Sequence, residues 1–271
     1  MTVRRWSILI PAAFLFGCGG HYILTVPDQL APVGGDAVAV CRLQRNDFFV
    51  LSLPVKQAAV RLVVPGCQER AAYTDKLGYA GTTVPVPSQP GRYRMYIHHQ
   101  DIEGEEVAGE VPLCVWDPGK AAVAVDLDCL PEAAEKESAG ARAALVRLWQ
   151  DANLLYLTRK DVSEHKRAHE RLAAGEYPDG PVLTWRRQRW HIVRSDRLKL
   201  PQVVVESRLV SQLTELRKVL PNLNVGVCES ALAAKAFEEA GMQCVIVGQA
   251  AAKAGNPTRV ESWSQLAREG L

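Results

Sequence analysis

The sequence has little net charge, no long apolar run and no cysteine spacing typical of a metal finger. Its 32 lysine and arginine residues nearly balance 30 aspartate and glutamate residues, so we expect no bulk attraction to nucleic acid. The apolar stretch near the N-terminus is shorter than the roughly 20 residues that cross a bilayer. The chain has 271 residues, of which 48% are hydrophobic, and this length leaves room for two ordinary domains.

The first 18 residues have the pattern of a secretory signal. Arg4 and Arg5 precede a short apolar stretch that ends at Gly17 and Cys18, the order of a positive region, an apolar region and a small residue. The cysteine after the small residue resembles the lipobox of bacterial lipoproteins, which implies that Cys18 is diacylated. We therefore expect a membrane-anchored lipoprotein of the bacterial cell envelope, facing the periplasm or exterior, with a tether over residues 19–30. A plain secretory signal or a retained anchor is the alternative.

Residues 27–117 are predicted to form a β-sandwich. Short apolar or alternating runs are separated there by glycine and proline, which is typical of strands joined by turns. The expected strands are 37–44, 48–53, 58–64, 82–87, 92–98 and 111–116. Residues 74–80 and 90–94 resemble bacterial immunoglobulin-like modules, which implies a spacer or adhesive domain. His98 and His99 are expected at the surface, because adjacent strand residues face opposite sides and do not form one metal site.

Residues 119–271 are predicted to form an α/β domain. Buried-strand patterns alternate there with helical patterns, so we expect a mainly parallel sheet with helices on both faces. Strands are expected at 121–127, 154–157, 181–185, 202–205, 223–227 and 244–247, and helices at 139–150, 163–174, 209–219, 231–240 and 262–269. The second of these helices is expected to expose His165, Lys166, His169 and Glu170. Ligands of such a sheet bind at the carboxyl ends of its strands.

Four segments of this domain resemble, in order, motifs of the haloacid dehalogenase (HAD) superfamily of phosphatases. An apolar strand ending in Asp126-x-Asp128 resembles the first motif, and an apolar strand ending in Thr158 resembles the second. Residues 177–183 resemble a segment of lipin-type and phosphatidate phosphatase domains, and residues 224–242 resemble the fourth motif. The resemblance implies a three-layer Rossmannoid α/β fold, capless because a single helix separates the first two motifs.

The resemblance also implies roles for individual residues. Asp126 is expected to be the nucleophile that attacks phosphorus, Asp128 the general acid and base, and Thr158 a hydrogen-bond donor to phosphate. Asp126, Asp128 and Glu229 are the expected ligands of magnesium, a cation that takes oxygen ligands. The alternative for the two aspartates is a helix-capping or turn role after a strand.

The fourth motif departs from the family pattern. Val227 stands where active members have the first acid, and the place of the later acid falls on Ala231 or Ala233. Glu229 is the carboxylate left in this loop, and its register is wrong unless the loop rearranges. Because the loss of an acid leaves a dication under-coordinated, magnesium is not expected to bind tightly. The sequence does not decide which of Lys199, Arg208 and Lys218 is the basic residue of the third motif.

Three functions therefore stay open. The first is an exported pseudoenzyme, whose phosphatase fold serves binding or scaffolding of a phosphorylated or anionic ligand. The second is a magnesium-dependent phosphomonoesterase similar to phosphatidate phosphatases, with Asp126 as nucleophile. The third is a structural protein of the cell envelope. Magnesium-dependent hydrolysis of a phosphoester distinguishes the second function from the other two.

A basic segment with interleaved aromatic residues is a candidate anion-binding site. Arg186, Arg187 and Arg189 lie between Trp185 and Trp190. Arginine binds phosphate bidentately and anionic lipid headgroups near a membrane, whereas an exported protein is not expected to meet nucleic acid. The alternative is a solvated β-hairpin whose arginine stems cover apolar surface.

Cys129 and Cys228 directly follow the strands of the first and fourth motifs. In the resembled fold these strands are neighbours about 4.8 Å apart, which implies that the two cysteines face each other across the site. The hypothesis is a disulfide that clamps the loops in place of magnesium and requires Cα atoms about 4.4–6.8 Å apart. The alternative is a pair of free, half-buried thiols.

Lipidation at Cys18 predicts how the full chain behaves in a detergent phase separation. Two acyl chains give stable anchoring, so protein from a bacterial host should enter the detergent phase, and the Cys18→Ser variant should stay in the aqueous phase. Wild-type protein recovered in the aqueous phase would contradict lipidation.

Overall fold

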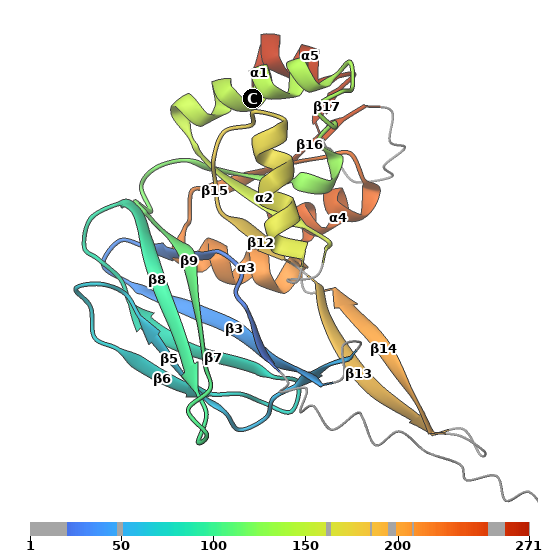
Figure 1. The fold of residues 1–271 in the computed structure, drawn as a ribbon. Coiled ribbons are helices and arrows are strands. Elements are labelled where there is room, and N and C mark those ends of the chain that lie inside the picture. Colours follow the sequence, from blue (N-terminus) through green and yellow to red (C-terminus); the bar gives the residue numbers. More distant parts are fainter. Residues whose placement is uncertain are drawn as a thin grey trace, which may run out of the picture.

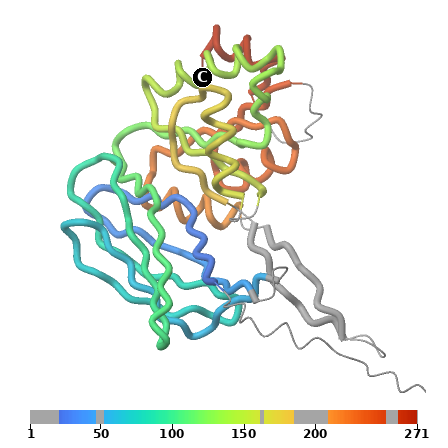
Figure 2. The backbone as a smooth tube through the Cα atoms, viewed as in Figure 1, coloured from blue at the N-terminus to red at the C-terminus, as the bar shows by residue number. Residues whose placement is uncertain are grey.

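The chain is rich in β-structure and forms several sheets. The computed structural model describes residues 21–47, 51–160, 164–184, 186–194, 199–207, 209–248 and 258–270. Cys18 and the rest of the predicted signal lie outside the described residues. Along the chain, a body of strands comes first and a body of strands and helices second, as the colours of the tube in Figure 2 show.

The N-terminal half is a β-sandwich of two sheets (Figure 1). The first sheet contains β1 (His21–Thr25), β3 (Asp36–Asp47), β4 (Leu51–Pro54) and β7 (Tyr79–Pro85). The second has the order β2 (Gln29–Pro32), β9 (Glu106–Trp116), β8 (Gly91–Gln100), β5 (Ala59–Val63) and β6 (Arg70–Tyr73). The described pairings are antiparallel except that of β2 with β9, which is parallel.

Apolar residues that alternate along the strands hold this sandwich together. Val60 and Leu62 of β5 are fully buried, as are Met95 and Ile97 of β8, and the residues between them are more exposed. A period of two puts every second side chain on the same face of a strand. The two sheets therefore close over one apolar core.

Two expectations for this half are wrong. Residues 21–25 pair with β3 as strand β1, so the tether predicted over 19–30 is shorter than predicted. His99 is buried, not at the surface. Its Nδ1 lies 2.8 Å from the Ala59 carbonyl oxygen, and its ring packs edge-on against Tyr22. The carbonyl of Ala59 thus partners Nδ1, whereas Nε2 of the same ring has no hydrogen-bond partner among the described residues.

The C-terminal half contains the expected parallel sheet. Its strand order is β12 (Val182–Thr184), β11 (Asn153–Thr158), β10 (Ala122–Asp126), β15 (Leu223–Cys228), β16 (Gln243–Val247) and β17 (Thr258–Val260). The described helices are η1 (Leu127–Cys129, 3₁₀), α1 (Ser138–Asp151), α2 (His165–Ala174), α3 (Leu209–Val219), α4 (Ala231–Glu239) and α5 (Trp263–Glu269). The chain order reverses between β10 and β15, which is where such sheets bind ligands.

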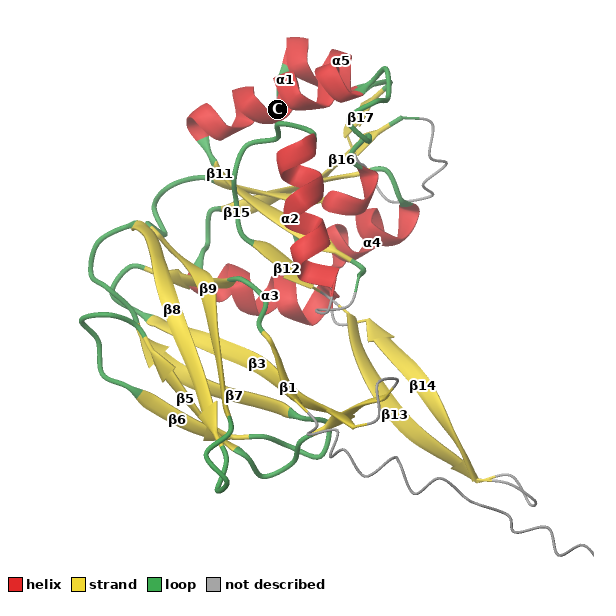
Figure 3. Ribbon diagram, viewed as in Figure 1, coloured by secondary structure: helices red, strands yellow, loops and turns green. Residues whose placement is uncertain are grey.

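Helices cover both faces of this sheet (Figure 3). Helices α1, α2 and α5 pack on the face that carries Val125 and Tyr156. Helices α3 and α4 pack on the opposite face, where Leu155 of β11 and Phe237 of α4 share one core. Adjacent residues of β11 thus belong to different cores and both are buried. This burial on both sides explains why the strands are continuous apolar runs in the sequence.

The two halves contact each other directly. Leu30 of β2 and Trp116 at the end of β9 pack against the core beneath α3 and α4. Arg92 of β8 forms an ion pair with Asp179, in the loop before β12. Apolar packing and polar contacts therefore both contribute to this interface.

The basic segment forms one strand of a hairpin. Strand β13 (Arg186–Arg194) pairs antiparallel with β14 (Lys199–Ser207) as a sheet of its own. The expected placement of 202–205 in the parallel sheet is therefore wrong. The structure does not describe the side chains of Arg186, Arg187 and Arg189. Binding of an anion by these residues therefore stays a prediction. Within the described ranges, no helix has the length and apolarity needed to cross a membrane.

Gly226 lies where α4 packs on β15. A Cβ atom at this position would lie 2.4 Å from Cγ of the buried Phe237. The variant Gly226→Ala should therefore lower the unfolding free energy by about 1–3 kcal/mol, the range for overpacked cores. The matched control is Gly81→Ala on β7, whose Cβ would meet its nearest atom at 3.6 Å. Urea denaturation measures both, and equal losses would contradict the packing of α4 on β15.

Candidate functional site

The residues of the first two motifs meet at the carboxyl edge of the parallel sheet. Asp126 is the last residue of β10, Asp128 lies in η1, and Thr158 is the last residue of β11. Strands β10 and β11 are parallel, hydrogen-bonded neighbours, so their carboxyl ends lie side by side. Asp126 and Thr158 are buried, and the side chain of Asp128 is 9% exposed. The structure thus brings these three predicted residues together.

Asp128 is held by the end of the neighbouring strand. Its Oδ1 accepts a hydrogen bond from the Thr158 hydroxyl at 3.1 Å. Its Oδ2 accepts from the backbone N–H and the Nε–H of Arg159, at 2.8 and 3.1 Å. Both carboxylate oxygens are therefore engaged by donors of one strand end. In this arrangement Asp128 links η1 to the end of β11.

Asp126 is a buried carboxylate that caps a short helix. Its Oδ1 accepts the N–H of Asp128 at 3.1 Å, at the N-terminus of η1, so the capping role considered for it is realised. Burial raises the pKa of Asp126 to about 6 because the charged form loses hydration, and the charge of Asp128 adds to the rise. Carboxyl groups with raised pKa values are frequent at functional sites.

Strand β15 places an apolar residue beside this carboxylate. Val227 pairs with Val125, one residue before Asp126, and it is fully buried in the core. Glu229 follows the strand, and burial raises the pKa of its carboxyl group. The charge of Glu229 also contributes to the raised pKa of Asp126. Glu229 therefore acts on Asp126 through its electrostatic field.

The predicted magnesium ligands do not form a set of converging oxygens. Among the described residues, the ligand atoms of Asp126, Asp128 and Glu229 do not form a group within 4.8 Å of one another. Both oxygens of Asp128 are already engaged by Thr158 and Arg159. Magnesium requires a nearly octahedral shell of oxygens. These residues, as they are arranged, do not fit that ion.

The predicted disulfide between Cys129 and Cys228 is wrong, because both are free thiols. Cys129 packs in the core with α1 and α5, whereas Cys228 packs in the core on the opposite face of the sheet. The Cys129 thiol donates to the carbonyl oxygen of Asp126 at 2.8 Å. The Sγ atom of Cys228 lies 3.7 Å from that of Cys244 on β16. Neighbouring strands do not bring together side chains that point to opposite faces.

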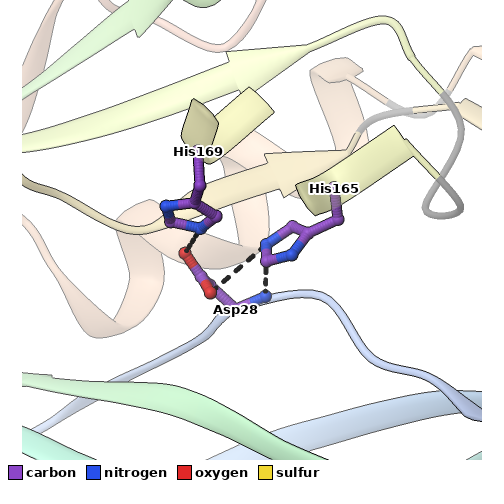
Figure 4. A group of neighbouring side chains, drawn as sticks. All are labelled: Asp28, His165 and His169. Carbon is purple, nitrogen blue, oxygen red and sulfur yellow. Dashed lines mark hydrogen bonds and ion pairs between the residues drawn. The ribbon is translucent and has the colours of Figure 1, made fainter. Parts of the chain in front are cut away.

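A second polar cluster joins the two halves of the chain (Figure 4). Asp28, between β1 and β2, points toward His165 and His169 of α2. Its Oδ2 lies 2.9 Å from Nε2 of His169 and accepts the N–H of Val182 at 2.8 Å. Its Oδ1 lies 3.2 Å from Nε2 of His165. Burial raises the pKa of Asp28, but the neighbouring imidazoles of His165 and His169 outweigh this effect and lower the pKa to about 2.

The expectation that α2 exposes both histidines is wrong. The side chains of His165 and His169 are 12% and 29% exposed, because this face of the helix lies against Asp28. Lys166 and Glu170, by contrast, are exposed as expected. The spacing of four residues does place the two histidines on one helix face. Their partner Asp28 is 137 positions from His165 and 141 from His169, and nothing in the local pattern indicates it.

A cavity of about 330 Å³ lies between the two halves. Its lining includes Arg92, Trp116, Trp149 and Asp179. None of the predicted site residues described here belongs to that lining. The cavity is therefore separate from the carboxylates at the edge of the sheet.

No protein-family model and no curated protein matches the chain. Among solved structures, the N-terminal Ig1-2 module of a Drosophila receptor protein tyrosine phosphatase is similar over 39% of this chain and 60% of its own, at 13% identity and a TM-score of 0.27. A Paenibacillus cycloisomaltooligosaccharide glucanotransferase is similar over 84% of this chain and 28% of its own, at 9% identity and a TM-score of 0.28. The chain thus spans less than two thirds of either structure. Likenesses this loose support no statement about its fold or activity.

Asp126 should make the stability of the protein depend on pH. Folding raises the pKa of Asp126 from 3.8 to about 6. The contribution of Asp126 to the unfolding free energy is therefore fully present below about pH 4, and it is lost as the pH rises through 6. Asp126→Asn should therefore be more stable than wild type above pH 6, by about 3 kcal/mol at most.

The two proteins should converge in stability toward pH 4. Urea denaturation between pH 4 and 8 measures the difference, with Asp151→Asn at the exposed end of α1 as the matched control. A difference between Asp126→Asn and wild type that does not vary with pH would contradict the raised pKa.

Proposed function

We propose that the protein is an exported, lipid-anchored protein of the bacterial cell envelope, whose phosphatase-like domain has lost catalysis and serves binding or scaffolding. One observation carries this proposal. Asp126 and Asp128 are retained at the sheet edge, but Val227 on the adjacent strand is fully buried in the core where the family has an acid.

The topology supports phosphatase ancestry for residues 119–271. The parallel sheet reverses its strand order between β10 and β15, and Asp126 ends the first strand at that point. Thr158 ends the neighbouring strand and donates to Asp128. These features agree with the resemblance to HAD phosphatases of the lipin type, which rests on the same residues.

The side-chain contacts support the loss of catalysis. A general acid must be free to reach the leaving oxygen, yet Asp128 accepts three hydrogen bonds from Thr158 and Arg159. A metal-dependent phosphatase also needs oxygens that converge on the ion. The buried Val227 contributes none, and Glu229 does not join the two aspartates in one ligand set.

The sandwich supports a spacer role next to the membrane. Its pairings of β3 with β1 and with β7, and the order β9-β8-β5 in the other sheet, resemble strands A-B-E and G-F-C of immunoglobulin-like domains. We propose an immunoglobulin-like domain between a lipidated Cys18 and the second half. The ligand of that half is proposed to be phosphorylated or otherwise anionic, with Arg186, Arg187 and Arg189 as its binding residues.

A magnesium-dependent phosphomonoesterase is the second candidate. The pKa of Asp126 near 6 favours it, because an active-site carboxyl group is commonly tuned toward the working pH. In that function Asp126 would act as nucleophile above pH 6, and Glu229 would replace the missing acid as a metal ligand.

Hydrolysis assays separate the two candidates. Wild type should hydrolyse p-nitrophenyl phosphate and phosphatidate with magnesium no faster than Asp126→Asn, and calorimetry should show no tight binding of magnesium. The Cys18→Ser chain should nevertheless sediment with phosphatidate vesicles, because binding without turnover is the proposed role. A magnesium-dependent rate that falls about 100-fold or more in Asp126→Asn would establish the phosphomonoesterase instead.

A further inference from the structure

We propose that Asp28, His165 and His169 form a zinc site that clamps the sandwich to helix α2. The proposal is independent of the phosphatase-like residues, because it rests on a different cluster at the interface of the two halves (Figure 4).

The donor atoms are of the right kind and nearly in place. Two imidazoles and a carboxylate are common zinc ligands. His165 and His169 both direct Nε2 at the carboxylate of Asp28, and the ligand atoms all lie within 4.8 Å of one another. A tetrahedral zinc with bonds of about 2.0–2.1 Å holds its ligands about 3.3 Å apart. The nitrogen–oxygen distances of 3.2 and 2.9 Å are close to that separation.

One oxygen of the cluster lacks a hydrogen-bond donor. The side chain of Asp28 is 0% exposed, and its Oδ1 accepts no hydrogen bond from the described residues. Nε2 of His165 accepts the backbone N–H of Asp28 at 3.1 Å, so it carries no proton that it could donate to the nearby Oδ1. A buried carboxylate oxygen without a donor is unfavourable. A cation between the two atoms removes this conflict.

The surroundings suit a bound ion. The N–H of Val182 holds Oδ2 of Asp28 at 2.8 Å, and such outer contacts orient the ligands of metal sites. His169 is partly exposed, at 29%, so the cluster is open on one side for entry of the ion. Water can then serve as the fourth ligand, and it also takes up the N–H of Asp28 that His165 releases.

The ligands come from both halves of the chain. Asp28 belongs to the sandwich, and the two histidines belong to α2. The complete site therefore exists only when the halves are docked, so zinc binding stabilises the docked arrangement by mass action. The site would act as a structural clamp that holds the second half at a fixed orientation on the sandwich.

Zinc binding by the full chain, purified in detergent and stripped with EDTA, tests the proposal. Wild type should bind one zinc ion per chain in competition with a chromophoric chelator, and zinc should raise its melting temperature. His169→Gln should weaken binding about 10-fold or more and abolish the thermal shift. The matched control is His98→Gln on β8, a residue paired with Glu106 at 3.7 Å, which should change neither result.

Cobalt substitution in wild type identifies the ligands without relying on a variant that folds. A tetrahedral spectrum free of thiolate charge-transfer bands is expected for nitrogen and oxygen ligands. A thiolate band would mean that cysteines hold the metal and would overturn the proposal. Wild type that binds no zinc, or His169→Gln that binds it as tightly as wild type, would overturn it too and leave a hydrogen-bonded ion pair.

Discussion

The buried carboxylate of Asp28 determines how the two halves of the molecule are joined. A charge that leaves water needs partners, and the hydrogen-bond partners of the Asp28 carboxylate are the imidazole of His169 on α2 and the N–H of Val182. A loss of these contacts while Asp28 stays buried would leave its charge without compensation. The apolar contacts of Leu30 and Trp116 alone impose no such directional requirement. Asp28, together with the ion pair of Arg92 and Asp179, therefore orients α2 and β12 on the sandwich.

Much of the fold could be predicted because burial is visible in composition. Strands β10 and β11 are buried on both faces, so they stand out as apolar runs, and α1 and α4 show the helical period. Strand β17 has three residues, too few for any pattern. The partner of a strand is also not a local property. For that reason β14 was predicted in the parallel sheet although it pairs with β13.

The candidate site, too, has some features that the local sequence determines and others that only the tertiary fold determines. The meeting of Asp126, Asp128 and Thr158 follows from strand ends in a parallel sheet, so their positions were predictable. The hydrogen bonds of Asp128 with Arg159 depend on side-chain conformations, which no spacing encodes. Whether Cys129 and Cys228 face each other depends on which side of the sheet each residue occupies. Asp28 and its histidines needed the tertiary fold, because their contacts cross the boundary between the halves.

The parallel pairing of β2 with β9 has a mechanical consequence. After β1 the chain crosses to β2 in the second sheet, and it leaves the sandwich at the end of β9, where Gln29 to Pro32 pair in register with Leu113 to Trp116. A force that pulls the N-terminal side away from the C-terminal half acts along both strands in opposite directions. The hydrogen bonds between the strands then carry the load in shear and must break together. A sandwich connected in this way resists extension between the start of β2 and the end of β9.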